Sequence, residues 1–147
     1  FDMDKVIQKN KDNPVFYCQY AYARASSVIN KSKNYDEFKN FENNLENITD
    51  LNLSNHEKEI ILKLIAWPHL LRSSSILMQP HKITNYLEDI CSHFHSFWNM
   101  GKDNKNLRIL DINKKEKTIN KLIWIQAFRI VLKRAFGIIG INSPETM

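Results

Sequence analysis

Aromatic rings and one arginine crowd together near the start of the chain. Phe16, Tyr17, Tyr20 and Tyr22 lie within seven residues, and Arg24 follows. Unpaired nucleobases stack on exposed rings, for about 1–3 kcal/mol each, and arginine stacks on a base or grips phosphate. Tyr20 and Arg24 are one helical turn apart, so the pair could hold one nucleotide between ring and guanidinium. The spacing therefore indicates a surface for single-stranded RNA.

The same residues have an ordinary structural interpretation. Tyr20 also fits a half-buried core tyrosine whose hydroxyl reaches solvent. Trp98 lies beside Phe97 at the edge of another apolar stripe, and it fits a core tryptophan equally well. The pattern alone leaves both alternatives open.

Residues that could carry catalysis are poorly arranged. Cys91 and His95 share one helical face, but His93 points nearly opposite, and two ligands do not close a zinc shell. The serines at 73–75 lack an assignable histidine–aspartate partner, and the adjacent carboxylates at 88–89 diverge around a helix. We expect no catalytic residues and no metal site. A small metal-dependent helical hydrolase that uses these three ligands is a rival hypothesis.

The elements that would position these residues are helices. Three glycines and four prolines make a turn-rich β fold improbable. The pattern predicts a first helix over 14–31, capped by Asn13, with an outward stripe at Tyr20, Arg24, Ser27 and Lys31. A polar connection follows over 32–53, which we expect to be mobile with at most one short helix.

Further helices follow from caps and breakers. A capping box at Ser54 and Glu57 opens a helix that should end at Trp67-Pro68. The other predicted elements are a helix over 69–79, a long helix over 81–100 stopped by Gly101, a charged loop over 101–116, a helix over 117–136 and an irregular tail. The expected fold is an all-α bundle of about five helices, forming one domain over 1–147.

Positive charge is concentrated in the last third of the chain. Residues 1–100 carry 11 basic and 12 acidic side chains, whereas residues 101–147 carry 10 basic and 4 acidic ones. A basic end suits a polyanionic partner, although a solvated basic face would look the same. Two cysteines outside any CxxC pair favour a reducing, intracellular setting. The apolar tract 119–141 is interrupted by polar and basic residues, among them Lys121, Gln126, Arg129, Lys133 and Arg134, so no membrane span is expected.

Three segments together resemble a known family. DNPVFYCQYAYAR (12–24) is similar to the DNP-x-Y-x-QYAHAR helix of the C-terminal, DALR-type anticodon-binding domain of arginyl-tRNA synthetases. PHKITNYLEDICSHFHSFWN (80–99) is similar to the family's PHRI-x-x-YL-x-x-LA-x-x-FHSFYN helix. FRIVLKRAFGIIGINSPETM (128–147) is similar to its terminal VRxVLxNGLxLLGxxAPExM. The segments occur in the family's order and at suitable separations.

The resemblance implies an anticodon-binding helical bundle of the class I aminoacyl-tRNA synthetase type. Carried over by motif position, the residues expected to meet the anticodon loop of arginine tRNA are Tyr20, Arg24, Trp98, Asn99 and Met147. Trp98 stands where the family has tyrosine, which keeps the stacking plane and removes a hydroxyl. Tyr22 replaces a histidine, and 133–135 departs from the family's small-Asn-Gly pattern.

The resemblance also implies a parent enzyme. The chain is expected to be the C-terminal part of a longer arginine–tRNA ligase, without the HIGH-like and KMSK-like signatures. The parent's own catalytic domain would use ATP and Mg²⁺, with no cofactor in this part. We expect a cytoplasmic, monomeric protein. A helical protein–protein interaction module is the alternative.

Overall fold

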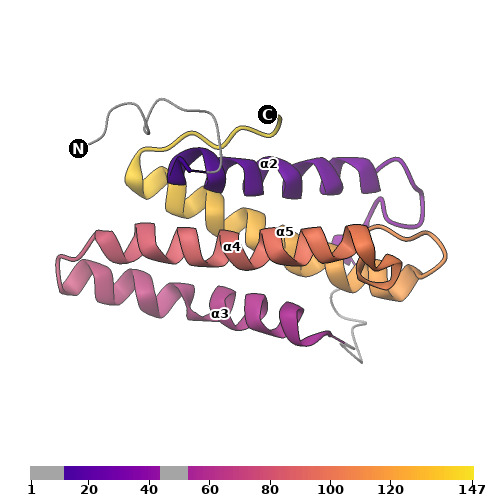
Figure 1. Cartoon of the computed structure of the whole chain (residues 1–147), viewed down its shortest axis with the longest axis horizontal. Helices are drawn as coiled ribbons and strands as arrows, with labels where there is room; N and C mark the ends of the chain where they lie inside the picture. The colour runs from indigo at the N-terminus through magenta and orange to yellow at the C-terminus, as the bar shows by residue number, and fades with distance from the viewer. Residues whose placement is uncertain (1–11, 44–52) are drawn as a thin grey trace.

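The computed structural model describes residues 12–43 and 53–147, and within them the chain is all-α. Four long helices form the bundle (Figure 1). They are α2 (Pro14–Ser32), α3 (Asn55–Ile76), α4 (His81–Asp103) and α5 (Lys115–Ile139), with a short 3₁₀ helix, η2 (Lys105–Leu107), between the last two. The prediction of an all-α bundle is confirmed, with one long helix fewer than expected.

The middle of the bundle is α4. It lies between α2 and α3, and α5 crosses behind it, in contact with the other three long helices (Figure 1). Large rings fill the space between them: Phe94 stacks on Phe128 with centroids 4.5 Å apart, and Trp124 meets Phe97 edge-on at 5.4 Å. These four side chains are almost fully buried, so the core lies where α4 and α5 cross.

Two helix starts follow the predicted capping chemistry. The Asn13 side chain accepts hydrogen bonds from the backbone N–H groups of Val15 (3.0 Å) and Phe16 (3.4 Å). At α3, the Ser54 hydroxyl accepts from the Glu57 N–H, and the Glu57 carboxylate accepts from the Ser54 N–H at 2.9 Å. Each cap satisfies donors that the first helical turn leaves unpaired.

Pro68 does not end a helix, so the prediction that a helix ends at Trp67-Pro68 is wrong. Residues predicted as two helices, 54–67 and 69–79, form the single helix α3 with Pro68 inside it. Tertiary contacts hold the turn before the proline: Trp67 packs on Tyr86 of α4 at 5.3 Å, and the Tyr86 hydroxyl donates to the Lys63 carbonyl at 3.1 Å. Packing on α4 thus offsets the local cost of about 3 kcal/mol for an interior proline.

Two glycines also fail to stop their helices. α4 continues past Gly101 to Asp103, and α5 continues past Gly137 to Ile139. The residue that ends α5 is Gly140, which has a left-handed backbone with φ of 75°. Its N–H and that of Ile141 both bond to the Phe136 carbonyl, which closes the last turn.

The described part of the connection after α2 is packed against the bundle. Residues 32–43 form successive tight turns, and Phe38 and Phe41 are almost fully buried. The rest of the predicted mobile connection, 44–52, lies outside the described residues. Its mobility stays a prediction.

The loop between α4 and α5 is fixed by a buried lysine. Lys121 is 6% exposed, and its ammonium donates to the carbonyls of Asn106 (3.1 Å) and Arg108 (2.8 Å). Thr118 adds a hydroxyl bond to the Asp111 carbonyl at 2.8 Å. Burial lowers the pKa of Lys121, while the nearby Glu57 carboxylate opposes that shift. The loop backbone is therefore tied to α5 by side chains.

The two terminal glycines of α5 should respond oppositely to alanine. Gly140→Ala forces a side chain into a left-handed conformation and should lower the free energy of unfolding by about 1 kcal/mol. Gly137→Ala is the matched control, because it lies inside the helix with open space around a new Cβ. It should stabilise by about 0.5–1 kcal/mol. Urea denaturation measures both, and equal losses would contradict the assignment of Gly140 as the stop.

Candidate nucleic-acid interface

Helix α2 presents two faces, as its sequence pattern predicts. Ala21 and Ala25 are fully buried, whereas Tyr20 is 36% exposed and Arg24 is half-buried. Tyr22 points the other way, is 1% exposed, and packs on Phe136 at 6.1 Å. The crowded rings of this helix therefore divide between the core and one outer surface.

Arg24 is the centre of that outer surface. Its guanidinium carbon lies 4.0 Å from the centroid of the Tyr20 ring and 5.3 Å from that of Trp98, on α4. One terminal nitrogen donates to the Tyr20 hydroxyl at 2.9 Å. Flat stacking of a guanidinium on aromatic rings is favourable, and it brings residues from two helices together.

His95 on α4 holds the guanidinium of Arg24 in place. The second terminal nitrogen of Arg24 lies 3.0 Å from Nδ1 of His95, and Nε2 of His95 lies 3.1 Å from the Tyr17 carbonyl. Arginine can only donate, so Nδ1 must accept, and the proton sits on Nε2, which donates to the carbonyl. His95 is therefore neutral in this arrangement. Burial lowers its pKa, the Tyr17 carbonyl opposes that shift, and the nearby Arg24 charge adds to it.

The prediction that a nucleotide lies between Tyr20 and Arg24 is wrong, because the two side chains are in direct contact. A base between ring and guanidinium would need about twice the ordinary stacking separation of about 3.5–4.0 Å. The observed 4.0 Å leaves room for neither base nor sugar. Tyr20 and Arg24 thus act as one composite surface, on whose outside a base would stack.

The two remaining predicted residues, Asn99 and Met147, make no described contact with the Arg24 stack. Asn99 is exposed and follows Trp98 on α4. Met147 is 52% exposed at the end of a tail that runs beside α2 (Figure 1). The Gln19 side chain holds that tail by donating to the Asn142 carbonyl at 3.1 Å. The tail that carries Met147 is therefore held against α2.

The exposed positive charge gathers around the loop between α4 and α5. The exposed cations of that region are Lys102, Lys105, Arg108, Lys115 and Lys117. The cations of α5 do not extend this surface as one basic face. Lys121 is buried beneath the loop, and Lys133 and Arg134 line a groove shared with α3.

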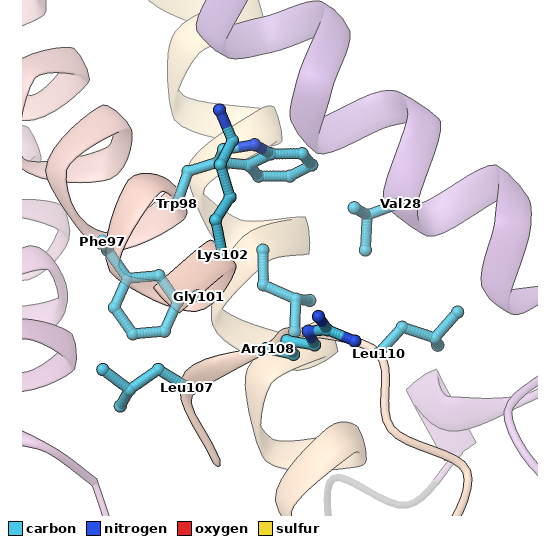
Figure 2. A pocket seen from close by; sticks show the side chains of 9 residues that line it. Val28, Phe97, Trp98, Gly101, Lys102, Leu107, Arg108 and Leu110 are labelled. Carbon is cyan, nitrogen blue, oxygen red and sulfur yellow. The ribbon is translucent and has the colours of Figure 1, made fainter. Parts of the chain in front are cut away.

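A pocket opens between this loop and Trp98 (Figure 2). Its volume is about 340 Å³. Val28 of α2 closes one side, and residues of α4 and the loop close the others. The lining residues are Val28, Phe97, Trp98, Gly101, Lys102, Leu107, Arg108, Ile109 and Leu110. Trp98 thus borders both the Arg24 stack and the pocket.

The alternative of a metal-dependent hydrolase finds no support in the geometry. Cys91 is fully buried beside Cys18, and both its burial and that neighbour raise the pKa of its thiol. His95 faces Arg24 and Tyr17 instead. In residues 12–43 and 53–147, His, Cys, Asp and Glu form no group of three or more suited to a metal ion.

Sequence reasoning missed the positioning role of His95 and the pocket. The histidine was considered only as a ligand paired with Cys91. Its spacing of three from Trp98 places both on one helical side, which is the signal that could have joined it to the aromatic surface. The pocket depends on how the loop folds back, which no local spacing shows.

Comparisons with known proteins define the family. The model of the DALR anticodon binding domain matches residues 18–147. Arginine–tRNA ligases of Pelagibacter ubique and Rickettsia felis are 37% and 36% identical to the chain, over its whole length. A crystal structure from Campylobacter jejuni, provisionally named an arginyl-tRNA synthetase, superposes with a TM-score of 0.77 at 20% identity, covering 100% of this chain and 29% of that one.

The fold and the candidate site together define a class of protein: an all-α bundle with an aromatic and cationic outer surface. The chain belongs to the DALR anticodon-binding domain family and is homologous to arginine–tRNA ligases. It spans about a quarter of the length of those two relatives, 25% and 26% respectively. Among the described residues, the helices are too short or too polar to cross a membrane.

Acid should weaken the fold through His95. The pKa of His95 lies below its ordinary value of 6.5 in the folded chain, so below about pH 6.5 the unfolded chain binds more protons. The contribution of His95 to the free energy of unfolding should be full above that pH and should be lost as the pH falls below it. His95→Phe removes the titration and should flatten this slope, although it lowers stability overall. Urea denaturation at several pH values measures the slope.

A matched variant separates this effect from the removal of a histidine as such. His69 is exposed on α3, and His69→Phe should keep the wild-type slope. An unchanged slope in His95→Phe would show that the buried histidine is not the group responsible.

Proposed function

We propose that the chain binds the anticodon loop of arginine tRNA. The observation that carries the proposal is the stack of Arg24 between Tyr20 and Trp98, which presents a guanidinium and two rings at the outer surface where α2 and α4 meet. Unstacked bases of an RNA loop are the ligands that such a surface suits. Family membership supports the same assignment.

Binding divides into base contacts and phosphate contacts. Bases of the loop stack on Tyr20 and Trp98, and Arg24 retains up to three of its five N–H donors for a base edge or a phosphate. Asn99 and Met147 contribute at the edge of the same surface. Cations of the α4–α5 loop neutralise the RNA backbone and hold the register, whereas the stacked bases select the anticodon.

The wider assignment extends to a longer enzyme. We propose that the chain is part of an arginine–tRNA ligase whose catalytic domain joins arginine to tRNA with ATP and Mg²⁺, in the cytoplasm and as a monomer. In that protein this domain acts by binding, so that the distant acceptor end reaches the catalytic domain. The 37% and 36% identity to arginine–tRNA ligases, over the whole of this chain and about a quarter of theirs, supports this assignment.

A second surface favours a protein contact. A groove of about 870 Å³ lies between α3 and α5, lined by apolar residues such as Trp67, Leu71 and Ile138 together with Lys133 and Arg134. Ile65 and Ile130 are also more than half exposed on these helices. Such a patch is typical of a docking site. We assign it to protein contact, either with the remainder of a ligase or with a separate partner.

Loss of one ring should weaken RNA binding without unfolding the chain. Tyr20→Ala and Trp98→Ala should each lower the affinity for an arginine anticodon stem-loop by roughly 5- to 150-fold, equivalent to one stack of about 1–3 kcal/mol. Tyr20→Phe keeps the ring and should bind nearly as well. Fluorescence anisotropy with labelled hairpin RNA measures the affinity.

The control variant and a second hairpin make this test specific. Ile65→Ala, on the exposed part of α3, should bind as the wild type does. A hairpin with a non-arginine anticodon should bind more weakly. Equal affinities for all variants and both hairpins would overturn the proposed site.

The loop cations should appear in the salt dependence. Lys105→Ala should lower affinity for every RNA hairpin and reduce the slope of log affinity against log salt by about 0.7–0.9. Lys133→Ala is the matched control, because it lies about 25–30 Å along α5 from the loop and lines the other groove. A shallow wild-type slope, or equal changes in both variants, would favour a protein partner over RNA.

A further inference from the structure

We propose that the pocket beside Trp98 receives one unstacked nucleobase of the RNA loop, with Lys102 and Arg108 on the phosphates that flank it. The inference rests on the proposed function and adds a base position to it. The first position is the Tyr20–Arg24–Trp98 stack, and the second is enclosed by the α4–α5 loop. Trp98 borders both, so consecutive bases of one strand could occupy them.

The size and lining of the pocket suit a flat heterocycle. Its volume of about 340 Å³ lies near the lower end of small-ligand pockets, which span about 300–1,000 Å³. One wall is the indole of Trp98, and Figure 2 shows Val28 of α2 across from it and Leu110 of the loop below. An aromatic face with aliphatic sides accepts any base by stacking and excludes water from its faces.

The charge around the pocket selects a polyanion over a protein segment. Of its nine lining residues, none is acidic, and both charged ones, Lys102 and Arg108, are cations exposed to solvent. Lys105 and Lys117, also exposed, extend the same sign along the loop and into α5. An apolar slot rimmed only by cations matches a nucleotide, whose base is apolar on its faces and whose phosphate is negative.

The pocket is built before any ligand arrives. The loop packs directly over α4 at Gly101, where even a Cβ would lie in ordinary van der Waals contact with the Leu107 carbonyl oxygen, at 3.4 Å. Lys121 holds the Arg108 carbonyl from beneath, at 2.8 Å, and Ile109 is 7% exposed. Because this wall is already fixed, a ligand does not have to order it, and little affinity is lost to the conformational entropy of the loop.

The test combines substitutions in the pocket with changes in the RNA loop. Leu110→Trp and, independently, Leu107→Trp place an indole where the base would lie, since both leucines line the pocket and are only half-buried. The RNA is an arginine anticodon stem-loop in which each loop nucleotide in turn is made abasic. Binding of the 147-residue chain to each hairpin is measured by fluorescence anisotropy, and circular dichroism confirms that each variant folds.

The inference predicts that a pocket substitution and the removal of one particular base have non-additive effects on affinity. For the wild type, one abasic position besides any that contacts the Tyr20 stack should lower affinity by roughly 5- to 150-fold, as for loss of one base stack. For Leu110→Trp or Leu107→Trp, the intact hairpin should lose a similar factor, and that abasic change should then add little. Ile112→Trp is the matched control: it lies in the same loop, is 50% exposed, and does not line the pocket, so its abasic profile should equal the wild type's.

Other outcomes separate this inference from the proposed function. If the hairpin binds and Tyr20→Ala weakens it, but no abasic position couples to either pocket variant, the pocket holds no base and the inference is overturned while the function stands. If the wild-type chain binds no hairpin at any salt concentration used, both are overturned.

Discussion

The contact between Arg24 and its neighbours on α4 organises the outer surface of this domain. A guanidinium carries its charge at every accessible pH, so placing it half-buried between two helices requires partners that accept its donors. Neutral His95 supplies one acceptor and the Tyr20 hydroxyl supplies another. The rings of Tyr20 and Trp98 cover its faces. These contacts fix where α2 and α4 meet at the surface, and hence where a base can stack.

The bundle holds that contact because α4 takes part in both halves of the structure. One side of α4 packs Phe94 and Phe97 into the core against α5, and another places buried His95 and half-buried Trp98 against α2. A shift of α4 would disturb the core and the stack together. Close packing therefore transmits rigidity from the interior to the site, and the side chains need little reordering when a ligand binds.

The sequence predicts the parts of this structure that depend on local chemistry. Side-chain caps at Asn13 and Ser54 follow from residue type and spacing, and both appear as expected. The predictions that Pro68 and Gly101 end helices are wrong: packing on α4 overrides the local preference at Pro68, and α4 simply continues past Gly101 to Asp103. The family motifs located Tyr20, Arg24 and Trp98, but spacing alone did not show that Arg24 closes on the tyrosine ring. That closure needs His95, whose partner is 71 positions away in the chain.

Lys121 and Lys105 show why composition alone could not define the basic surface. They are the same residue type and lie in the same charged third of the chain, yet one is exposed and the other is 6% exposed beneath the loop. The ammonium of Lys121 replaces its lost water with two backbone carbonyls, which compensates in part for its burial. Its charge therefore holds the loop backbone, whereas the charge of Lys105 remains in solvent, where it can attract phosphate. The positive net charge of this region thus divides between building the pocket wall and facing solvent, and only the folded positions of the side chains distinguish the two.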